Sequence, residues 1–256
     1  MTLSDDDYER YARHLILREI GGAGQMRLRA ATILVIGAGG LGSPALLYLA
    51  AAGVGTLRIL DDDAVALSNL QRQILHRSDD VGRPKVESAA RALAALNPGV
   101  RVDARAERFS QETAAKAADG VDLILDGSDN LATRRLANAL AIEREIPWVF
   151  GAVGQWEGQV SVFDPGRGGP CYACLFPEDP ADGLAASCAE GGVLGALTGV
   201  IGTLMAVEAV KTLVGAGDPL RGRLLLYDAL YAETRAIAVA RRPDCSVCCR
   251  VAAVSP

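Results

Sequence analysis

The feature that most constrains this chain is an apolar, strand-like segment that is followed at once by a glycine-rich loop. Residues 32–36 (TILVI) are apolar and rich in β-branched side chains, as in a strand buried on both faces of a parallel sheet. The loop 37–42 (GAGGLG) comes next, and residues 45–52 predict a helix. This strand–loop–helix order restricts the fold to classes that are built from such units.

Strand and helix patterns alternate along the rest of the first 150 residues or so. Such an alternation predicts a doubly wound, mostly parallel sheet, in which ligands bind at the carboxyl ends of the strands. Ahead of it, residues 4–20 predict one helix that Ser4 caps and that ends at Gly21. The predicted strands are 56–60, 100–106, 122–126 and 148–152, and the predicted helices are 85–96, 111–118 and 130–145.

The remainder of the chain has a different pattern. Residues 155–163 alternate in part between apolar and polar side chains, and residues 192–214 form a long apolar run that predicts a helix. Residues 223–227 and 233–240 predict two late antiparallel strands. We therefore predict an α/β fold with a doubly wound, Rossmann-like mixed sheet. One domain is expected over residues 1–256, with two halves that meet near residue 150.

Composition excludes several classes of protein. The chain has 256 residues, half of them hydrophobic, and its net charge of −5 argues against a large basic face for nucleic acid. The longest uncharged run, residues 191–207, is rich in glycine and shorter than a membrane span of about 20 residues, so it favours a buried helix. The acids at positions 5–7 are unlike a basic signal peptide. We expect a cytoplasmic protein that binds neither nucleic acid nor membrane.

The glycine-rich loop has the pattern that lets a backbone approach phosphate closely. Its N–H groups and the start of the next helix favour an anion, although a tight turn without a ligand has the same pattern. Asp61 follows the second predicted strand, where an acid in nucleotide-binding folds accepts hydrogen bonds from ribose hydroxyls. NAD and ATP both fit these features. The candidate glycines are Gly37, Gly39, Gly40 and Gly42.

A polar cluster after Asp61 favours ATP over a dinucleotide. Arg72 and Lys85 offer the cations that a triphosphate needs, with Asn69 beside them, although the same residues also fit an ordinary charged surface. Asp129 follows a predicted strand, where it is placed either to hold Mg²⁺ or to cap the next helix. The sequence therefore predicts a site for MgATP, with these alternatives open.

Six cysteines are present, and without a signal peptide they favour metal binding or catalysis over disulfides. Two C-x-x-C pairs fit a structural, tetrahedral zinc site, with redox motifs as the alternative. Cys249 adjoins the second pair and is expected to be a bystander. Cys188 stands apart before the long apolar run, where it fits either a nucleophile or a small buried side chain. The paired cysteines are Cys171, Cys174, Cys245 and Cys248.

The two histidines of the chain are His14 and His76. Neither lies beside a Ser or Cys in a local motif of the kind that nucleophilic catalysis uses. We therefore expect both histidines to have structural roles.

Taken together, these motifs resemble one family of proteins. They are similar to the MoeB/ThiF (HesA/MoeB/ThiF) family of sulfur-carrier-protein adenylyltransferases, which are relatives of ubiquitin-activating enzymes, and most of all to the MoeB type. The resemblance implies one adenylation domain, with a nucleotide-binding first half and a carrier-binding and zinc-binding second half. The matching stretches run from Arg10 to Cys248: RYARHLIL, GAGGLG, DDDAVALSNLQRQILH, VGRPKVESA, DGSDN, GAVGQWEGQVSVF, CYACLFP, SCAEGGVLG and CSVC.

The resemblance implies an enzyme that uses MgATP to activate the terminal Gly-Gly carboxylate of a small ubiquitin-like sulfur-carrier protein. The products are an acyl-adenylate and pyrophosphate, and a sulfur donor later attacks the acyl-adenylate. Because the chain ends at Pro256, without an appended rhodanese domain, we expect a separate donor such as a cysteine desulfurase or a rhodanese. The expected carrier is MoaD-like or ThiS-like. The motifs favour molybdopterin biosynthesis, while thiamine biosynthesis and thiolation of tRNA or metabolites use the same chemistry.

The resemblance also implies roles for individual residues. Arg72 and Lys85 would stabilise charge at the α-phosphate, and Asp129 would hold Mg²⁺. Arg13 matches an arginine that reaches into the partner subunit's site, which implies a homodimer. Cys188 matches a loop cysteine that bonds covalently to carrier or sulfur in some members and is dispensable in others. The other implied nucleotide contacts are Gly40, Asp61, Ser68, Asn69, Gln71 and Asn130, and the implied zinc ligands are Cys171, Cys174, Cys245 and Cys248.

The chain departs from the family pattern at two positions. Asp62 stands where relatives often have an aromatic residue, which alters the surroundings expected for the ribose. Cys249 stands where glycine commonly follows the last zinc ligand, so either Cys248 or Cys249 fits that role. Two other functions stay as alternatives: an NAD- or FAD-binding oxidoreductase and a non-catalytic binding module. The combination of Arg72, Lys85 and Asp129 speaks against both.

Overall fold

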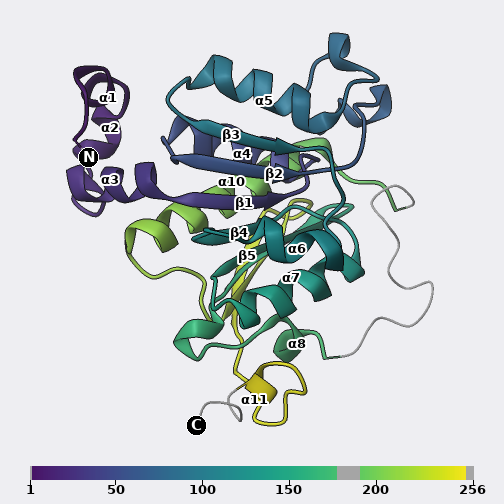
Figure 1. Ribbon diagram of the computed structural model, residues 1–256. Coiled ribbons are helices and arrows are strands. Elements are labelled where there is room, and N and C mark those ends of the chain that lie inside the picture. Colours follow the sequence, from purple (N-terminus) through teal and green to yellow (C-terminus); the bar gives the residue numbers. More distant parts are fainter. Residues whose placement is uncertain (1, 178–190, 252–256) are drawn as a thin grey trace.

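The computed structural model describes residues 2–177 and 191–251 (Figure 1). An eight-stranded sheet lies at its centre, in the order β3-β2-β1-β4-β5-β6-β7-β8. The strands are β1 Thr32–Ile36, β2 Thr56–Leu60, β3 Arg101–Arg105, β4 Leu123–Asp126, β5 Trp148–Gly154, β6 Glu157–Phe163, β7 Arg223–Asp228 and β8 Glu233–Ala238. The helices are α1 Asp5–Arg10, α2 Ala12–Leu15, α3 Gly21–Ala30, α4 Gly42–Ala51, α5 Lys85–Leu96, α6 Gln111–Ala117, α7 Leu131–Glu143, α8 Tyr172–Leu175, α10 Gly195–Val214 and α11 Cys248–Val251. Short 3-10 turns are η1 Leu67–Asn69, η2 Ser78–Asp80 and η3 Pro165–Arg167.

The sheet is parallel in one half and antiparallel in the other. Neighbours from β3 to β5 pair in parallel. Neighbours from β5 to β8 pair antiparallel. β1 lies between β2 and β4, so the chain winds away from it in opposite directions and leaves a crevice at the carboxyl ends of the strands. The predicted α/β class with a mixed sheet is confirmed, and the antiparallel part already starts at β6.

Helices cover both faces of the sheet because its central strands are buried on both sides. Along β1, Ile33 and Val35 belong to one apolar cluster, while Leu34 and Ile36 belong to a second. This follows from the period of two along a strand. Side chains of α4, α5 and α10 complete the first cluster, and side chains of α6 and α7 complete the second.

α10 is the predicted apolar helix, and it packs in the interior. Among the described residues it is the one helix long and apolar enough to cross a membrane, yet 50% of that apolar window is buried. It contacts α4, β5 and β6. Its apolar side chains, among them Ile201 and Met205, belong to the core cluster, which confirms the interpretation of a buried helix.

The prediction of one helix over residues 4–20 is wrong. The chain forms α1 and α2 with a break at Tyr11, and Gly21 begins α3 instead of ending a helix. The Tyr11 side chain is buried, and its hydroxyl accepts a hydrogen bond of 2.8 Å from Asn97 Nδ2. Tertiary packing of this side chain overrides the local helical pattern. Ser4 does cap α1, in a capping box with Asp7.

Candidate nucleotide site and cysteine cluster

A cavity of about 460 Å³ opens at the carboxyl ends of β1, β2 and β4. It lies where the strand order reverses, which is the usual ligand position in a doubly wound sheet. The sequence-predicted residues that line it are Gly37, Gly39, Gly40, Asp61, Arg72, Lys85, Asp129 and Asn130. The topology therefore brings together residues that are far apart in the sequence.

The glycine loop forms one wall of this cavity directly after β1. Gly37 has a φ of +90°, a conformation that other residues rarely adopt. Gly42 does not line the cavity. It lies against the loop, and a Cβ there would come within 2.0 Å of the Gly37 carbonyl oxygen. Any larger residue at position 42 would collide with the loop, so the glycine allows α4 to begin in direct contact with it.

Asp61 connects the end of β2 to the glycine loop. Its Oδ2 accepts a hydrogen bond of 2.8 Å from the Ala38 N–H, and its Oδ1 accepts one of 2.9 Å from the Asp63 N–H. Burial raises the pKa of the Asp61 carboxyl, and the Lys85 ammonium opposes that shift. A carboxylate has about four acceptor positions, so capacity for ribose hydroxyls remains.

Lys85 is the first residue of α5, and its side chain is 5% exposed. Its ammonium lies 2.6 Å from Asp63 Oδ2 and 4.0 Å from Asp61 Oδ1. A buried ammonium needs a counter-charge, and the largely exposed Asp63 supplies it here. An anionic ligand that approached this ammonium would therefore compete with Asp63 for it. The local sequence around Asp63 does not indicate this ion pair, because Lys85 lies 22 residues further along the chain.

Arg72 is held beside the glycine loop by the turn η1. Its guanidinium donates hydrogen bonds to Asn69 Oδ1 (3.2 Å) and to the Ser68 carbonyl oxygen (3.4 Å). A Cβ at Gly40 would lie 3.6 Å from the Arg72 Cγ. Ser68 and Asn69 do not line the cavity but orient a residue that does. Gln71 also lies outside the cavity wall, where it packs against the start of α10.

The loop after β4 places an acid at the cavity. Asp129 is exposed and lines the cavity. The cap of α7 is Asn130, whose Oδ1 accepts a hydrogen bond of 2.9 Å from the Thr133 N–H. Asp129 is therefore not the helix cap, and its carboxylate is available to a cation. Asp126 is fully buried behind it, where Oδ1 accepts from the Ser128 N–H and burial raises the carboxyl pKa.

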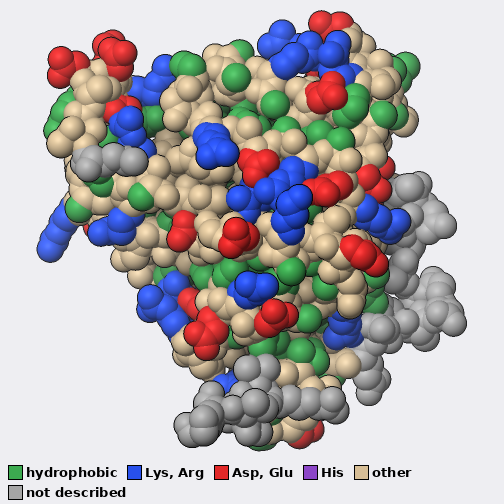
Figure 2. Space-filling view, in the orientation of Figure 1, with side chains coloured by type: hydrophobic (Ala, Val, Ile, Leu, Met, Phe, Trp, Pro, Cys, Tyr) green, Lys and Arg blue, Asp and Glu red, His purple; other side chains and the backbone are tan. Residues whose placement is uncertain are grey.

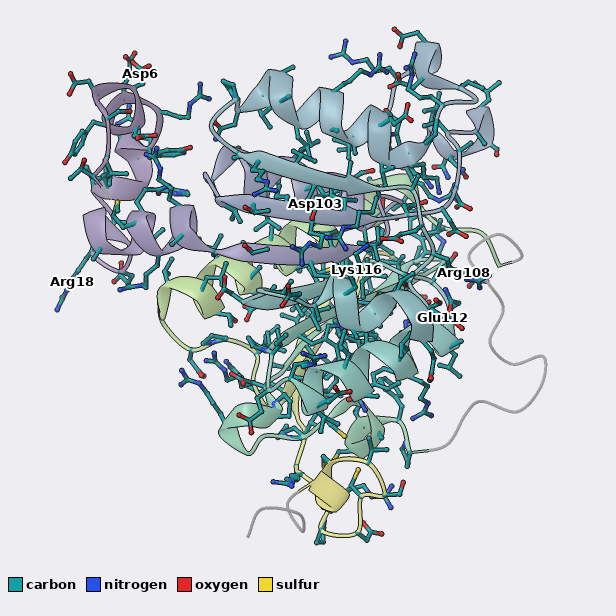
Figure 3. All side chains as sticks on the ribbon, in the orientation of Figure 1. Asp6, Arg18, Asp103, Arg108, Glu112 and Lys116 are labelled. Atoms are coloured by element: carbon teal, nitrogen blue, oxygen red, sulfur yellow. The ribbon has the colours of Figure 1, made fainter. Side chains whose placement is uncertain are left out.

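Sequence reasoning missed several residues of the cavity wall. Arg134 donates a hydrogen bond of 3.2 Å to the Ser128 carbonyl, and its guanidinium carbon lies 5.3 Å from the Phe150 ring centroid. Arg108 follows β3 and lies on the side of the molecule where the parallel strands end (Figure 3). Two signals in the sequence point to these residues. Arg108 comes after the carboxyl end of a strand, and Arg134 lies one helical turn beyond Asn130. The missed lining residues include Arg108, Phe109, Arg134 and Thr198.

Charges of both signs meet at this cavity. Its wall contains cations from four separate segments and acids from two. Over the face shown in Figure 2, basic and acidic side chains are likewise interspersed, without a broad field of one sign. This distribution agrees with a compact anionic ligand at one site better than with a long polyanion across the surface. The charged residues of the wall are Arg72, Lys85, Arg108 and Arg134, with Asp61, Asp62, Asp63 and Asp129.

A second candidate site lies between α8 and α11, where Figure 3 shows sulfur atoms gathered. The four paired cysteines are buried there, and their Sγ atoms all lie within 4.8 Å of one another. Burial raises the pKa of the Cys171 thiol to about 11, so a cation is needed to hold it as a thiolate at neutral pH. Four thiolates in this arrangement fit Zn²⁺ with no open position. Neighbouring Sγ distances are 3.9 Å (Cys171–Cys174), 3.7 Å (Cys171–Cys245) and 3.6 Å (Cys174–Cys248).

Cys248→Ser is expected to lower the zinc content of the purified protein from about one ion per chain to a small fraction of that. The melting temperature should fall as well, because the free energy of binding a structural metal is also folding free energy. Metal analysis and thermal unfolding measure both effects. Cys249→Ser is the matched control, since Cys249 Sγ donates to the Arg242 carbonyl (3.3 Å) instead of joining the cluster. Zinc lost from the Cys249 variant and retained by the Cys248 variant would contradict this assignment.

The remaining sequence-predicted residues are Arg13, which lies away from the cavity, and Cys188. Arg13 is an exposed residue of α2, which projects with α1 at the end of the molecule opposite α6 (Figure 1). Figure 3 shows the same separation between Asp6 and Arg108. Cys188 lies within residues 178–190, outside the described part of the chain.

Comparison with known sequences identifies relatives of this chain. The model of the ThiF family matches residues 11–247. The chain is 49% identical to a sulfur carrier protein adenylyltransferase of Thermus thermophilus, over 97% of this chain and 93% of that protein. It is 47% identical to the SAMP-activating enzyme E1 of Haloferax volcanii, over 97% and 92%. It is 48% identical to the probable adenylyltransferase/sulfurtransferase MoeZ of Mycobacterium tuberculosis, over 95% of this chain and 63% of that protein.

Solved structures give the same fold. Escherichia coli MccB in complex with MccA-N7isoASN matches with a TM-score of 0.84, over 96% of this chain and 75% of that chain, at 21% identity. That likeness shows the fold, while the family match extends over nearly the whole chain. Sequence and architecture together establish that this chain belongs to the ThiF family.

Proposed function

We propose that this chain is an adenylyltransferase that activates the C-terminal Gly-Gly carboxylate of a ubiquitin-like sulfur-carrier protein with MgATP. The observation that carries the proposal is the single cavity that joins the glycine loop, Asp61, Arg72, Lys85 and Asp129. The names of relatives that are nearly half identical support it, because they describe adenylyltransferases and an activating enzyme.

The chemistry requires a leaving group on a carboxylate that is itself a weak electrophile. A terminal carboxylate oxygen of the carrier attacks the α-phosphorus of ATP, and the bond from that phosphorus to pyrophosphate breaks. Charge accumulates on the α-phosphate and on the departing pyrophosphate, so preorganised cations lower the barrier. Arg72 and Lys85 line the cavity and are available for this task. Mg²⁺, held by Asp129, would neutralise further phosphate charge.

The binding of the nucleotide is divided among four segments of the chain. The glycine loop would offer backbone N–H groups to the phosphates, as such loops do at a helix N-terminus. Asp61 would accept hydrogen bonds from the ribose hydroxyls, and Asn130 would lie beside the nucleotide. Ser68 and Asn69 would contribute through Arg72, which they orient.

The rest of the assembly follows from the same family relationship. We propose a homodimer in which Arg13 serves the partner's site, a zinc ion that four cysteines hold in the second half of one domain, and a separate sulfur donor. Cys188 would bond covalently to carrier or sulfur after adenylation. We assign the reaction to the cytoplasm and to molybdopterin biosynthesis, with thiamine biosynthesis and thiolation as the alternatives that the choice of carrier separates.

Asp63→Asn is expected to lower the KM for ATP by roughly two- to fivefold, which is the range expected from the energy of an exposed ion pair. The reason is that Asp63 competes with phosphate oxygens for the Lys85 ammonium, which lies 2.6 Å away. ATP–pyrophosphate exchange at varied ATP concentration measures the change. Asp62→Asn is the matched control, because it removes the same charge from the adjacent exposed position, where no ion pair with Lys85 forms. A KM that rises in Asp63→Asn, or that falls equally in both variants, would contradict the competition.

The proposed function is tested by ATP–pyrophosphate exchange with zinc-loaded protein, Mg²⁺ and one purified carrier at a time. MoaD-like and ThiS-like carriers are each added with and without the terminal Gly-Gly. We expect exchange with one intact carrier and none with its truncated form. Exchange that occurs without a carrier would count against the proposal. So would the absence of exchange with all of the intact carriers.

A further inference from the structure

His76 is buried between the glycine loop and α5, and both of its ring nitrogens have partners. Nε2 lies 2.9 Å from the Ala38 carbonyl oxygen, inside the loop. Nδ1 lies 2.9 Å from the Ser88 hydroxyl oxygen, on α5. A carbonyl oxygen can only accept, so Nε2 carries the proton and donates it to Ala38. The ring therefore connects the glycine loop to the helix that begins with Lys85.

This contact fixes the direction of one peptide group. The Ala38 N–H donates to Asp61 Oδ2 (2.8 Å), and the Ala38 carbonyl accepts from His76, so both polar groups of Ala38 are held. In a planar trans peptide, the carbonyl of one residue and the N–H of the next point in opposite directions. The Gly39 N–H must therefore point away from His76. Gly39 lines the cavity, and no acceptor among the described residues pairs with its N–H.

The ring itself is locked in place from the side of α5. The Ser88 hydroxyl donates a hydrogen bond of 2.6 Å to Asp80 Oδ2, and its oxygen also lies 2.9 Å from His76 Nδ1. Asp80 in turn forms an ion pair with Arg91 and is buried. Ser88 follows Lys85 by three residues, which places both on one face of α5. A movement of His76 would thus change the position of the glycine loop relative to Lys85.

The surroundings of the ring lower the pKa of the His76 imidazole. Burial lowers the pKa of His76 first of all, and the nearby Lys85 ammonium lowers it further. The Ala38 carbonyl and the Asp61 carboxylate act in the opposite direction. Asp80 is the other charged group that reaches the ring, through Ser88. The contact with Ala38 requires a proton on Nε2, because a carbonyl oxygen can only accept a hydrogen bond.

We propose that His76 is a positioning residue for nucleotide binding: it holds the Ala38 carbonyl so that the Gly39 N–H is turned toward the phosphates. Through Ser88 it also sets the distance between that N–H and the Lys85 ammonium. The inference rests on the proposed function only in that ATP supplies the phosphates. His76 takes part in no bond that forms or breaks.

Two substitutions at the same position separate this role from a merely structural one. In His76→Gln the amide nitrogen can take the place of Nε2 and still donate to Ala38. In His76→Asn the shorter side chain can reach Ser88 but not Ala38. We expect the Kd for MgATP, measured by calorimetry, to rise at least about tenfold in His76→Asn and to stay within about threefold of wild type in His76→Gln. The Kd for adenosine, which lacks phosphates, should be unchanged in both.

An equal effect on ATP and adenosine, or equal ATP affinity in the two variants, would overturn the inference. If His76→Asn fails to fold, both ligands lose binding, and Ser88→Ala then takes its place. Ser88→Ala removes the hydroxyl that contacts the ring but keeps the His76 side chain in place. It must weaken the binding of ATP and leave the binding of adenosine unchanged. Wild-type protein that binds ATP but shows no carrier-dependent exchange would remove the proposed function and leave this inference standing. Wild-type protein that binds no ATP would overturn both.

Discussion

Asp129→Ala is expected to reduce carrier-dependent adenylation by about 10³-fold or more while the fold stays intact. The reason is that Mg²⁺ would lose its protein ligand, and a metal ion contributes several kcal/mol to the stabilisation of charge at a phosphoryl group. Asp129 is exposed and caps no helix, since Asn130 has that role. Its loss should therefore leave the melting temperature within a few degrees of the wild type. Single-turnover formation of the acyl-adenylate measures the effect.

Asp79→Ala is a suitable control for this prediction. Asp79 is also an exposed acid, but it lies on η2 and outside the cavity wall. It removes the same charge and should leave the rate near that of the wild type. Near-normal adenylation by Asp129→Ala would remove the residue from the site. A large loss in Asp79→Ala would show that net charge, and not a metal ligand, is responsible.

Arg72→Ala is expected to slow adenylation by roughly 10²-fold or more, as for the removal of one preorganised charge contact. Arg72 is half-buried, lies beside Gly40 and is oriented by Ser68 and Asn69, so the guanidinium is already in place before the reaction. We expect the loss chiefly in kcat, because the charge that Arg72 faces grows in the transition state. Steady-state exchange at varied ATP concentration separates kcat from KM.

Arg72→Lys sharpens this test. Lysine keeps the charge but lacks the planar fork that donates to Asn69 and to the Ser68 carbonyl. An intermediate rate is therefore expected, between those of the wild type and the alanine variant. A rate in Arg72→Ala that equals the wild type would exclude Arg72 from the reaction. Full activity in Arg72→Lys would show that orientation by η1 is unimportant.

Most of the fold could be predicted because its elements carry local signals. The helix Lys85–Leu96 and the strand Thr32–Ile36 have the predicted bounds, since a proline and a glycine-rich loop mark their ends. The N-terminal segment could not be predicted, because the break at Tyr11 depends on a hydrogen bond from the distant Asn97. The signal that decides it is tertiary and has no counterpart in the local sequence.

The candidate site was predictable to a similar degree. Residues that belong to a motif, such as Gly39 and Asp61, lie at the cavity because the topology of the sheet places strand ends together. Arg134 and Arg108 reach the wall through the packing of α7 and the end of β3, so their positions in the sequence identify them only once these elements are placed around the cavity. The ion pair of Asp63 with Lys85 likewise depends on two segments that meet only in the folded chain.

The central claim is that the adenylate is placed on the carboxyl terminus of a carrier protein. The most direct measurement is the intact mass of the carrier after incubation with this protein, ATP and Mg²⁺, followed by mapping of the modified residue. The account predicts a gain of one adenylate at the terminal glycine, and none on a carrier without its Gly-Gly. An unmodified carrier while ATP is consumed, or an adenylate on a side chain, would contradict it.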